Sequence, residues 1–234
     1  MKILAIESSA KAASAALCED GKLICQYWQG SGLTHSKTLL AMTESLLKNL
    51  DLTMDDIDEV AVAKGPGSFT GIRIGAAAAK GLAWGADKKV VGVSTLEAMA
   101  YHLADHDDCI ICPVMDARRS QVYNAKFFPK GGELERLCPD RAISLEQLIS
   151  EAKFDEKPYF LVGDGAEMCY NIMKEQGADV RLAPDFIRLQ SAWGVAMAAR
   201  HCEAVSPDDL VPNYLRLSQA ERERLEREKA NAVK

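Results

Sequence analysis

The order of the expected strands and helices in the first half of the chain returns in the second half. Hydrophobic periodicity and turn residues predict three strands, then helix, strand, helix, strand and helix, over residues 2–6, 13–18, 22–28, 36–50, 59–63, 68–84, 90–93 and 95–102. From Cys109 the same order is expected over residues 109–115, 121–128, 133–137, 145–152, 159–162, 166–175, 179–182 and 191–202. Internal duplication of this kind predicts an α/β chain of two similar βββαβα-type lobes, with a ligand cleft between them.

The two lobes are expected over residues 1–107 and 108–217. Residues 218–234 form a charged tail, in which ERERLEREK alternates acids and bases around a single leucine. A segment without an apolar face cannot add to a core, so the tail is expected to be a solvated helix or disordered.

Composition argues against a general nucleic-acid-binding protein, a secreted protein and a membrane protein. The net charge of −6 opposes a general nucleic-acid-binding surface, so any RNA contact has to be local or supplied by a partner. Seven cysteines without paired zinc spacing favour a reduced, cytoplasmic protein, and Glu7 interrupts the apolar run that a signal peptide needs. No apolar run reaches the length of a membrane span, so no membrane association is expected.

The sequence GPGSFTGIRIG at residues 65–75 predicts a tight turn between a buried strand and a helix. Ser68 or Thr70 can cap that helix by accepting its first N–H groups. Such a turn can hold an anion at the helix N-terminus or can be purely structural. It lacks the Lys-Ser/Thr of a P-loop and the spacing of a dinucleotide-binding loop, so neither motif is supported.

Three small residues recur along the same helix. Gly71, Gly75 and Ala79 at i, i+4 and i+8 form one stripe almost without side chains. Because glycine inside a helix costs about 1 kcal/mol relative to alanine, the stripe predicts a close backbone approach. The approaching element is either the chain's own sheet or the helix of another protein.

The duplicated order, with an acidic residue after the first strand of each lobe, resembles the actin-like ATPase superfamily of sugar kinases, actin and Hsp70. Five separated motifs resemble one family more specifically: ILAIESS (3–9), VAKGPGSFTGIRIG (62–75), GVSTLEAMA (92–100), MDARRSQVY (115–123) and PNYLR (212–216). Together they are similar to the TsaB, or YeaZ, family of bacterial tRNA threonylcarbamoyladenosine biosynthesis proteins, to about Arg216.

The resemblance implies a non-catalytic subunit that pairs with TsaD and, with the ATPase TsaE, supports transfer of threonylcarbamoyl from threonylcarbamoyl-AMP. The acceptor is the adenosine beside the anticodon in tRNAs that read ANN codons, and tRNA is contacted indirectly through the complex. It also implies a homodimer when TsaD is absent. No intrinsic cofactor is expected, and a nucleotide is expected only at the complex interface.

The metal-binding positions of the catalytic relative are expected to be lost. The resemblance aligns its HxxxH motif with Thr95 and Met99 of this chain. A hydroxyl and a thioether are poor substitutes for imidazole at a hard or borderline divalent metal, so no metal site is expected. His102 and His106 also have i, i+4 spacing, but acidic residues around them suggest a solvated helix end.

The alternative function is that of an enzyme with the actin-like fold, a phosphotransferase or ATPase that uses Glu7 and Asp116. Paired carboxylates across a cleft hold Mg²⁺ in kinases of this superfamily, and Glu7 and Asp116 follow the first strands of the two lobes. Against it, Ser8 and Ser9 stand where those kinases have a Gly-Thr turn. The candidate anion or nucleotide residues for the cleft are Glu7, Ser8, Ser9, Gly65, Gly67, Asp116 and Arg118.

The resemblance also implies that the first two long helices of the first lobe meet TsaD, or a second copy. The expected interface residues are Leu39, Met42, Thr43, Leu46, Gly71, Arg73, Gly75 and Ala79. The substitution Gly75→Leu is therefore expected to break pairing while leaving the fold intact.

Overall fold

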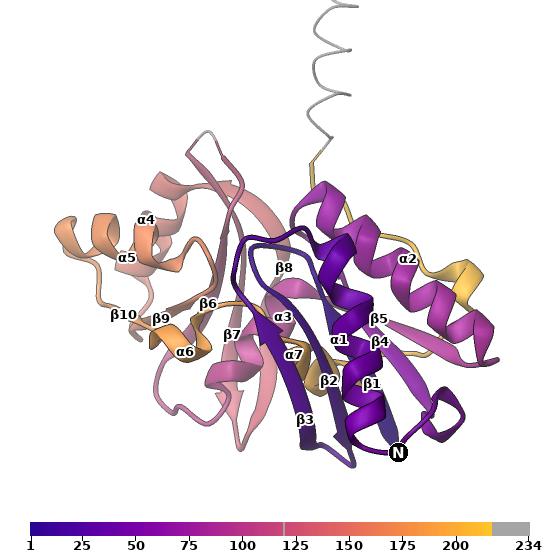
Figure 1. Cartoon of the computed structure of the whole chain (residues 1–234). Helices are drawn as coiled ribbons and strands as arrows, with labels where there is room; N and C mark the ends of the chain where they lie inside the picture. The colour runs from indigo at the N-terminus through magenta and orange to yellow at the C-terminus, as the bar shows by residue number, and fades with distance from the viewer. Residues whose placement is uncertain (119, 217–234) are drawn as a thin grey trace, which may run out of the picture.

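A computed structural model describes residues 1–118 and 120–216 of the chain, and the predicted tail 218–234 lies outside the described residues. Two five-stranded sheets stand side by side, each with helices packed on its outer face (Figure 1).

The two sheets have the same strand order. The first contains β1 (Lys2–Glu7), β2 (Ala13–Glu19), β3 (Lys22–Gln29), β4 (Glu59–Gly65) and β5 (Lys89–Ser94), in the order β3-β2-β1-β4-β5. The second contains β6 (Ile110–Asp116), β7 (Gln121–Lys130), β8 (Glu133–Ser144), β9 (Tyr159–Val162) and β10 (Val180–Leu182), in the order β8-β7-β6-β9-β10. In both, the first three strands are antiparallel and the last two run parallel to the first. The predicted duplication is confirmed.

Alternation along β1 explains how both faces of the first sheet are covered. Leu4 and Ile6 point to one face, where α1 (His35–Asn49) and α2 (Phe69–Gly85) pack. Ile3 and Ala5 point to the other face, into a different apolar cluster. The second sheet repeats this arrangement, with α4 (Leu145–Phe154) and α5 (Ala166–Glu175) on its outer face.

The last helix of each lobe packs on the sheet of the other lobe. The helix α7 (Ala192–Ala199) joins the cluster of β1, β2, β4 and β5, while α3 (Thr95–Ala100) contacts β6 and β7. Figure 1 shows both helices between the two sheets. The sequence AWGVAMAA is apolar on every side, as expected of a helix buried between layers. Each core therefore contains a helix from the other half of the chain.

The largest differences from the prediction are in the second lobe. The strand β8 continues to Ser144, beyond the expected 133–137, through a stretch where its pairing with β7 is irregular. A short helix, α6 (Asp185–Arg188), was not predicted; four residues are too few to show a helical period.

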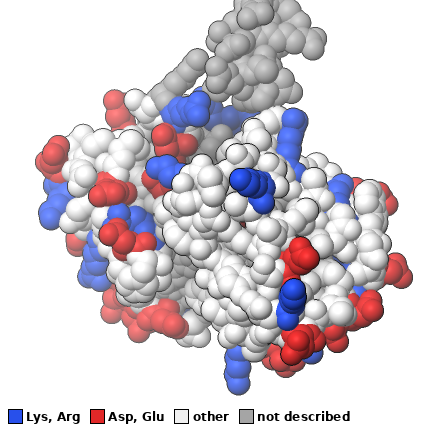
Figure 2. All heavy atoms as spheres, viewed as in Figure 1, with Lys and Arg blue, Asp and Glu red and all other residues white. Residues whose placement is uncertain are grey.

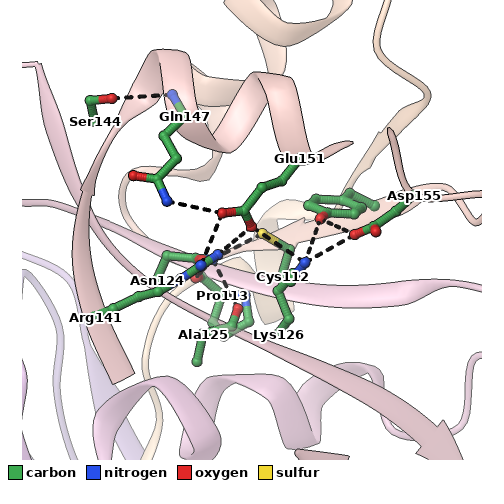
Figure 3. A network of polar contacts seen from close by, with 11 residues as sticks. Cys112, Pro113, Asn124, Ala125, Lys126, Arg141, Ser144, Gln147, Glu151 and Asp155 are labelled. Carbon is green, nitrogen blue, oxygen red and sulfur yellow. Dashed lines mark hydrogen bonds and ion pairs between the residues drawn. The ribbon is translucent and has the colours of Figure 1, made fainter. Parts of the chain in front are cut away.

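A polar network fixes β7 and β8 to α4 (Figure 3). The Oδ1 atom of the buried Asn124 accepts two bonds from Arg141, which also donates to both carboxylate oxygens of Glu151 at 3.0 and 2.5 Å. The Lys126 ammonium lies 3.3 Å from Glu151 and 3.0 Å from Asp155. Because every charge has a partner of opposite sign, this half-buried cluster can be retained inside the lobe.

Candidate functional site

A cavity of about 720 Å³ lies between the lobes. The first lobe contributes the turn after β1 and the N-terminus of α2, and the second contributes the turn after β6 and the loop before α5. The residues 213–216 form the remaining wall. Its volume is in the range of small-molecule sites, and its position is the cleft that the duplication predicts.

The glycine turn before α2 lets three backbone segments meet. Gly65 and Gly67 have positive φ angles of 118° and 158°, and a Cβ on either would collide with a carbonyl oxygen, of Asn213 and of Ser9 respectively. Ser68 then caps the helix by accepting a bond from the Gly71 N–H at 3.3 Å, so the predicted cap is confirmed. The close approach of Asn213 and Ser9 is therefore enough to explain why glycine stands at positions 65 and 67.

Glu7 does not face Asp116 across the cavity. Its side chain is fully buried outside the cavity wall, where Oε1 accepts a 2.5 Å bond from the Ser9 N–H and Oε2 has no partner among the described residues. Burial raises the pKa of Glu7 to about 7. Asp116 is exposed in the cavity. Glu7 and Asp116 therefore do not make the pair of facing carboxylates expected for a phosphotransferase. The Glu7 carboxyl, predicted to face the cleft, is enclosed by the turn that follows it.

The second carboxylate of the cavity is Asp164, which sequence reasoning did not single out. Burial raises its pKa, and Gln190 donates to its Oδ1 at 3.3 Å. The duplication could have placed Asp164 at the cleft, because Gly163-Asp164-Gly165 is the loop that corresponds in the second lobe to the glycine turn before α2. Among the seven predicted anion or nucleotide residues, the cavity is lined by Ser9, Gly67, Asp116 and Arg118, and not by Glu7, Ser8 or Gly65.

The two positions aligned with the HxxxH motif are core positions. Thr95 and Met99 are both fully buried in α3, with Met99 in the cluster around the second sheet. No group of three His, Cys, Asp or Glu side chains in the described part of the chain is arranged to hold a metal ion. A hydroxyl and a thioether do not make a donor set for such an ion either.

His102 is packed rather than solvated, which corrects the sequence-based interpretation. One ring nitrogen lies 2.6 Å from the Ile187 carbonyl and the other 2.8 Å from the Ser191 hydroxyl, while the ring stacks on Trp193. Burial lowers its pKa to about 4. His102 is buried because α7, the last helix of the second lobe, packs against the first lobe. It brings Ser191 and Trp193 onto a helix end that looks exposed in sequence.

Most of the predicted interface residues are part of the chain's own core. Met42 is half-buried and Arg73 exposed, whereas the other six are buried: Leu39, Thr43, Leu46, Gly71, Gly75 and Ala79. A Cβ on Gly75 would lie 2.6 Å from the Ser8 Oγ and 3.3 Å from Val62. The stripe of small residues thus serves the approach of α2 to the first sheet, and Gly75→Leu is not compatible with an undisturbed fold.

Comparisons with known proteins agree on one family. A family model described as TsaD, tRNA N6-adenosine threonylcarbamoyltransferase, matches residues 31–223. The TsaB protein of Bacillus subtilis, a tRNA threonylcarbamoyladenosine biosynthesis protein, is 34% identical over 98% of this chain and 100% of its own length. The chain belongs to the TsaB family. The solved structure of YeaZ from Pseudomonas aeruginosa, 25% identical, superposes with a TM-score of 0.78 over 92% of this chain and 99% of that one.

The fold of this TsaB-family chain is the expected duplicated actin-like fold. An activator of 2-hydroxyisocaproyl-CoA dehydratase from Clostridium difficile, with bound ADPNP, shares the architecture at 12% identity and a TM-score of 0.50. That similarity covers 85% of this chain and 94% of the activator and concerns the fold alone. In the described residues, no helix is both long and apolar enough to cross a membrane.

A second row of α2 residues in this TsaB-family chain points outward. We define it as the outward stripe: Thr70, Arg73, Ala77, Gly81 and Trp84, all exposed. A Cβ added to Gly81 would meet nothing within 4 Å, and the Trp84 side chain is 57% exposed. The neighbouring α1 exposes Leu40 together with Lys37, Glu44 and Lys48. Figure 2 shows few charged side chains over β3, which packs beside α1. The outward stripe itself has one charged side chain, that of Arg73.

Residues 211–216, which we call the strap, run from the first lobe to the second across the cavity. The Asn213 N–H donates to the Lys64 carbonyl at 2.7 Å, and Arg216 donates to the Ala117 carbonyl at 2.5 Å. Between these ends, the Tyr214 ring stacks on Phe69 with 4.4 Å between centroids. The PNYLR segment of this chain, residues 212–216, therefore connects the two lobes.

Proposed function

We propose that this chain is a non-catalytic subunit that pairs with TsaD and, with TsaE, supports threonylcarbamoyl transfer from threonylcarbamoyl-AMP to tRNA. The acceptor in this proposal is the adenosine beside the anticodon of tRNAs that read ANN codons, and tRNA is contacted through the complex. Relatives named for threonylcarbamoyladenosine biosynthesis support the pathway. The proposed site of action is the cytoplasm.

The observation that carries the pairing is the outward stripe of α2. Ala77 and Gly81 leave the helix backbone accessible between Arg73 and Trp84, so a second helix can approach closely and bury Trp84 and Leu40. The partner is proposed to be TsaD because the family model of that transferase matches this chain. Related lobes present related helices, which also supports a homodimer through the same face when TsaD is absent.

The non-catalytic role is supported by the chemistry of the cleft. Thr95 and Met99 are core residues rather than metal ligands, and Glu7 is enclosed away from Asp116. Kinases of the superfamily hold a magnesium nucleotide between paired carboxylates, and this pair is not formed here, because Glu7 is buried outside the cavity that Asp116 lines. We propose that a nucleotide binds only where TsaD adds its own residues.

The test is threonylcarbamoylation of tRNA in a purified mixture of TsaD, TsaE, threonylcarbamoyl-AMP and ATP, with and without this chain. Modification should require this chain together with TsaD, and the chain alone should neither modify tRNA nor consume ATP. Full activity without the chain would overturn the accessory role. Turnover by the chain alone would instead support the phosphotransferase or ATPase alternative at Asp116.

A further inference from the structure

The strand β3 is the outer strand of the first sheet, and its outer edge has no backbone partner within the described residues. In the order β3-β2-β1-β4-β5 it pairs with β2 alone. No other described residue forms a backbone hydrogen bond with Lys22–Gln29. We call this outer row of N–H and C=O groups the β3 edge. Such an edge is a template for one more strand.

The outer strands β5, β8 and β10 are all protected. Val205 forms two backbone bonds with Val90 of β5, at 3.0 and 2.8 Å. The strand β8 carries Pro139 and several charged side chains, and β10 has only three residues. In contrast, β3 has eight residues and a single charge, at its first position. A bulge at Ile24 interrupts its pairing with β2, so the regular part of the β3 edge is Cys25–Gln29.

The β3 edge lies in an uncharged segment. No charged residue occurs from Leu23 to Thr34, in a chain of which 26% of the residues are charged. Figure 2 shows few charged side chains over β3. Leu23, Ile24 and Trp28 of the strand are exposed, and so is Leu33 in the loop after it. Exposed apolar side chains therefore lie beside unpaired peptide groups, and an uncharged strand would cover both.

Side-chain contacts hold β3 in place from both faces of the sheet. Asn49 of α1 donates to the Tyr27 hydroxyl on one face. On the other face, the Gln26 Oε1 atom accepts a 2.9 Å bond from the Trp193 N–H of α7. The strand is therefore already ordered, so pairing with it costs little further conformational entropy in this chain.

We propose that the β3 edge pairs with the β3 edge of a second copy of this chain, in an antiparallel two-fold arrangement that joins the two first sheets. A second copy fits because it brings an equally uncharged strand, whereas a charged strand would find no ion-pair partner from Leu23 to Thr34. Both copies then use the same surface, as a two-fold interface requires.

The register follows from the regular part of the β3 edge. A two-fold axis through Tyr27 uses all of Cys25–Gln29 and keeps each side chain on its own face of the joined sheet. The two Tyr27 rings then form a cross-strand aromatic pair. This surface differs from the outward stripe of α2, so the proposal does not depend on the proposed pairing with TsaD.

The experiment measures self-association of the full chain by analytical ultracentrifugation over a concentration series. All proteins carry Gly81→Leu, so that association through the outward stripe does not contribute. Tyr27→Lys places two like charges opposite each other and should raise the dimer dissociation constant at least about 10-fold. Ile24→Lys adds a charge at an exposed position next to the regular edge and should raise it at least about 3-fold.

Phe154→Lys is the matched control, because it adds the same charge at an exposed apolar residue on α4 of the second lobe. Its dissociation constant should equal that of the parent protein. Urea midpoints show whether each variant is folded, and Ile24→Lys still tests the surface if Tyr27→Lys is not. In the wild-type chain, alternate amides from Cys25 to Gln29 should exchange more slowly as concentration rises.

Three results would overturn the proposal. The first is a monomer at every concentration, and the second is a dimer that neither lysine variant on β3 weakens. The third is slower exchange at Cys25–Gln29 only when TsaD is added, which would mean that the β3 edge takes a strand of TsaD instead of a second copy. None of these results bears on the outward stripe, whose test is TsaD binding by Gly81→Leu.

Discussion

The Ser8 hydroxyl donates a 2.9 Å hydrogen bond to the Gly71 carbonyl, joining the turn after β1 to the first turn of α2. The two backbones are so close that a Cβ on Gly71 would collide with the Ser8 carbonyl oxygen. The small residues on this side of α2 are therefore explained within the lobe. Those on the opposite side, Ala77 and Gly81, have no such explanation within the described residues.

A matched pair of substitutions separates these two faces of α2. Gly75→Leu introduces a side chain against Ser8 and Val62, so we expect the free energy of unfolding to fall by about 3 kcal/mol or more. Gly81→Leu points into open space and should leave stability unchanged or raise it by about 0.8 kcal/mol. Gly81→Leu should weaken the proposed binding to TsaD at least about 10-fold while the protein keeps its native stability, whereas Gly75→Leu acts on stability. Urea unfolding measures the stability of each variant, and titration with TsaD measures its affinity. Normal TsaD binding by Gly81→Leu would show that the outward stripe is not the TsaD-binding surface.

The buried Glu7 should give stability an unusual dependence on pH. Its pKa is raised from 4.5 to about 7 in the folded chain, so between these values only the unfolded chain ionises. Its stabilising effect is complete below pH 4.5 and is lost as the pH rises to about 7, by about 3 kcal/mol in total. His102 acts in the opposite direction, because its lowered pKa costs stability as the pH falls below 6.5.

Glu7→Gln isolates the contribution of that carboxyl group, since His102 and Asp164 are present in both proteins. The stability of Glu7→Gln relative to the wild type should rise by about 3 kcal/mol between pH 4.5 and pH 8. Urea unfolding at four or five pH values measures this difference. Parallel stability profiles for the two proteins would mean that Glu7 is ionised in the folded chain.

The network in Figure 3 should depend on Glu151. Its carboxylate accepts two bonds from Arg141 and pairs with Lys126. Glu151→Gln therefore leaves the half-buried Arg141 guanidinium without a carboxylate, while Lys126 keeps Asp155. We expect a loss of about 2 kcal/mol, seen as a lower urea midpoint at unchanged slope. Glu135→Gln, an exposed carboxylate on β8, is the control and should stay within about 0.5 kcal/mol. Equal midpoints for the two variants would show that the network adds nothing measurable.

Local chemistry and repetition were enough to predict most elements of the fold. The Ser68 cap depends on neighbours in sequence, and the repeated order of strands and helices along the chain follows from the duplication. The face of α2 that turns inward could not be predicted in the same way. Its sequence offers small residues on both sides and only two basic residues, Arg73 and Lys80, so hydrophobic periodicity does not distinguish the face that meets the sheet.

The site was harder to predict because it is built from long-range contacts. A carboxylate after a first strand is expected to reach solvent, yet Ser8, Ser9 and the glycine turn enclose Glu7. His102 is covered by residues almost ninety positions later in the chain. The sequence PNYLR is one of the five motifs on which the resemblance rests, but only the folded chain shows Tyr214 against Phe69 and Arg73.

The exchange of α3 and α7 has a consequence for synthesis of the chain. The inner face of the first sheet, formed by residues that leave the ribosome first, is completed by a helix that ends at Ala199. Until that helix is made, Ile3 and Ala5 have no permanent cover, so the N-terminal lobe cannot finish folding during translation as an independent unit. A gene cut between the halves would yield two fragments that each lack one helix of a core. Mixing the two fragments should restore both complete cores, which neither fragment can form alone.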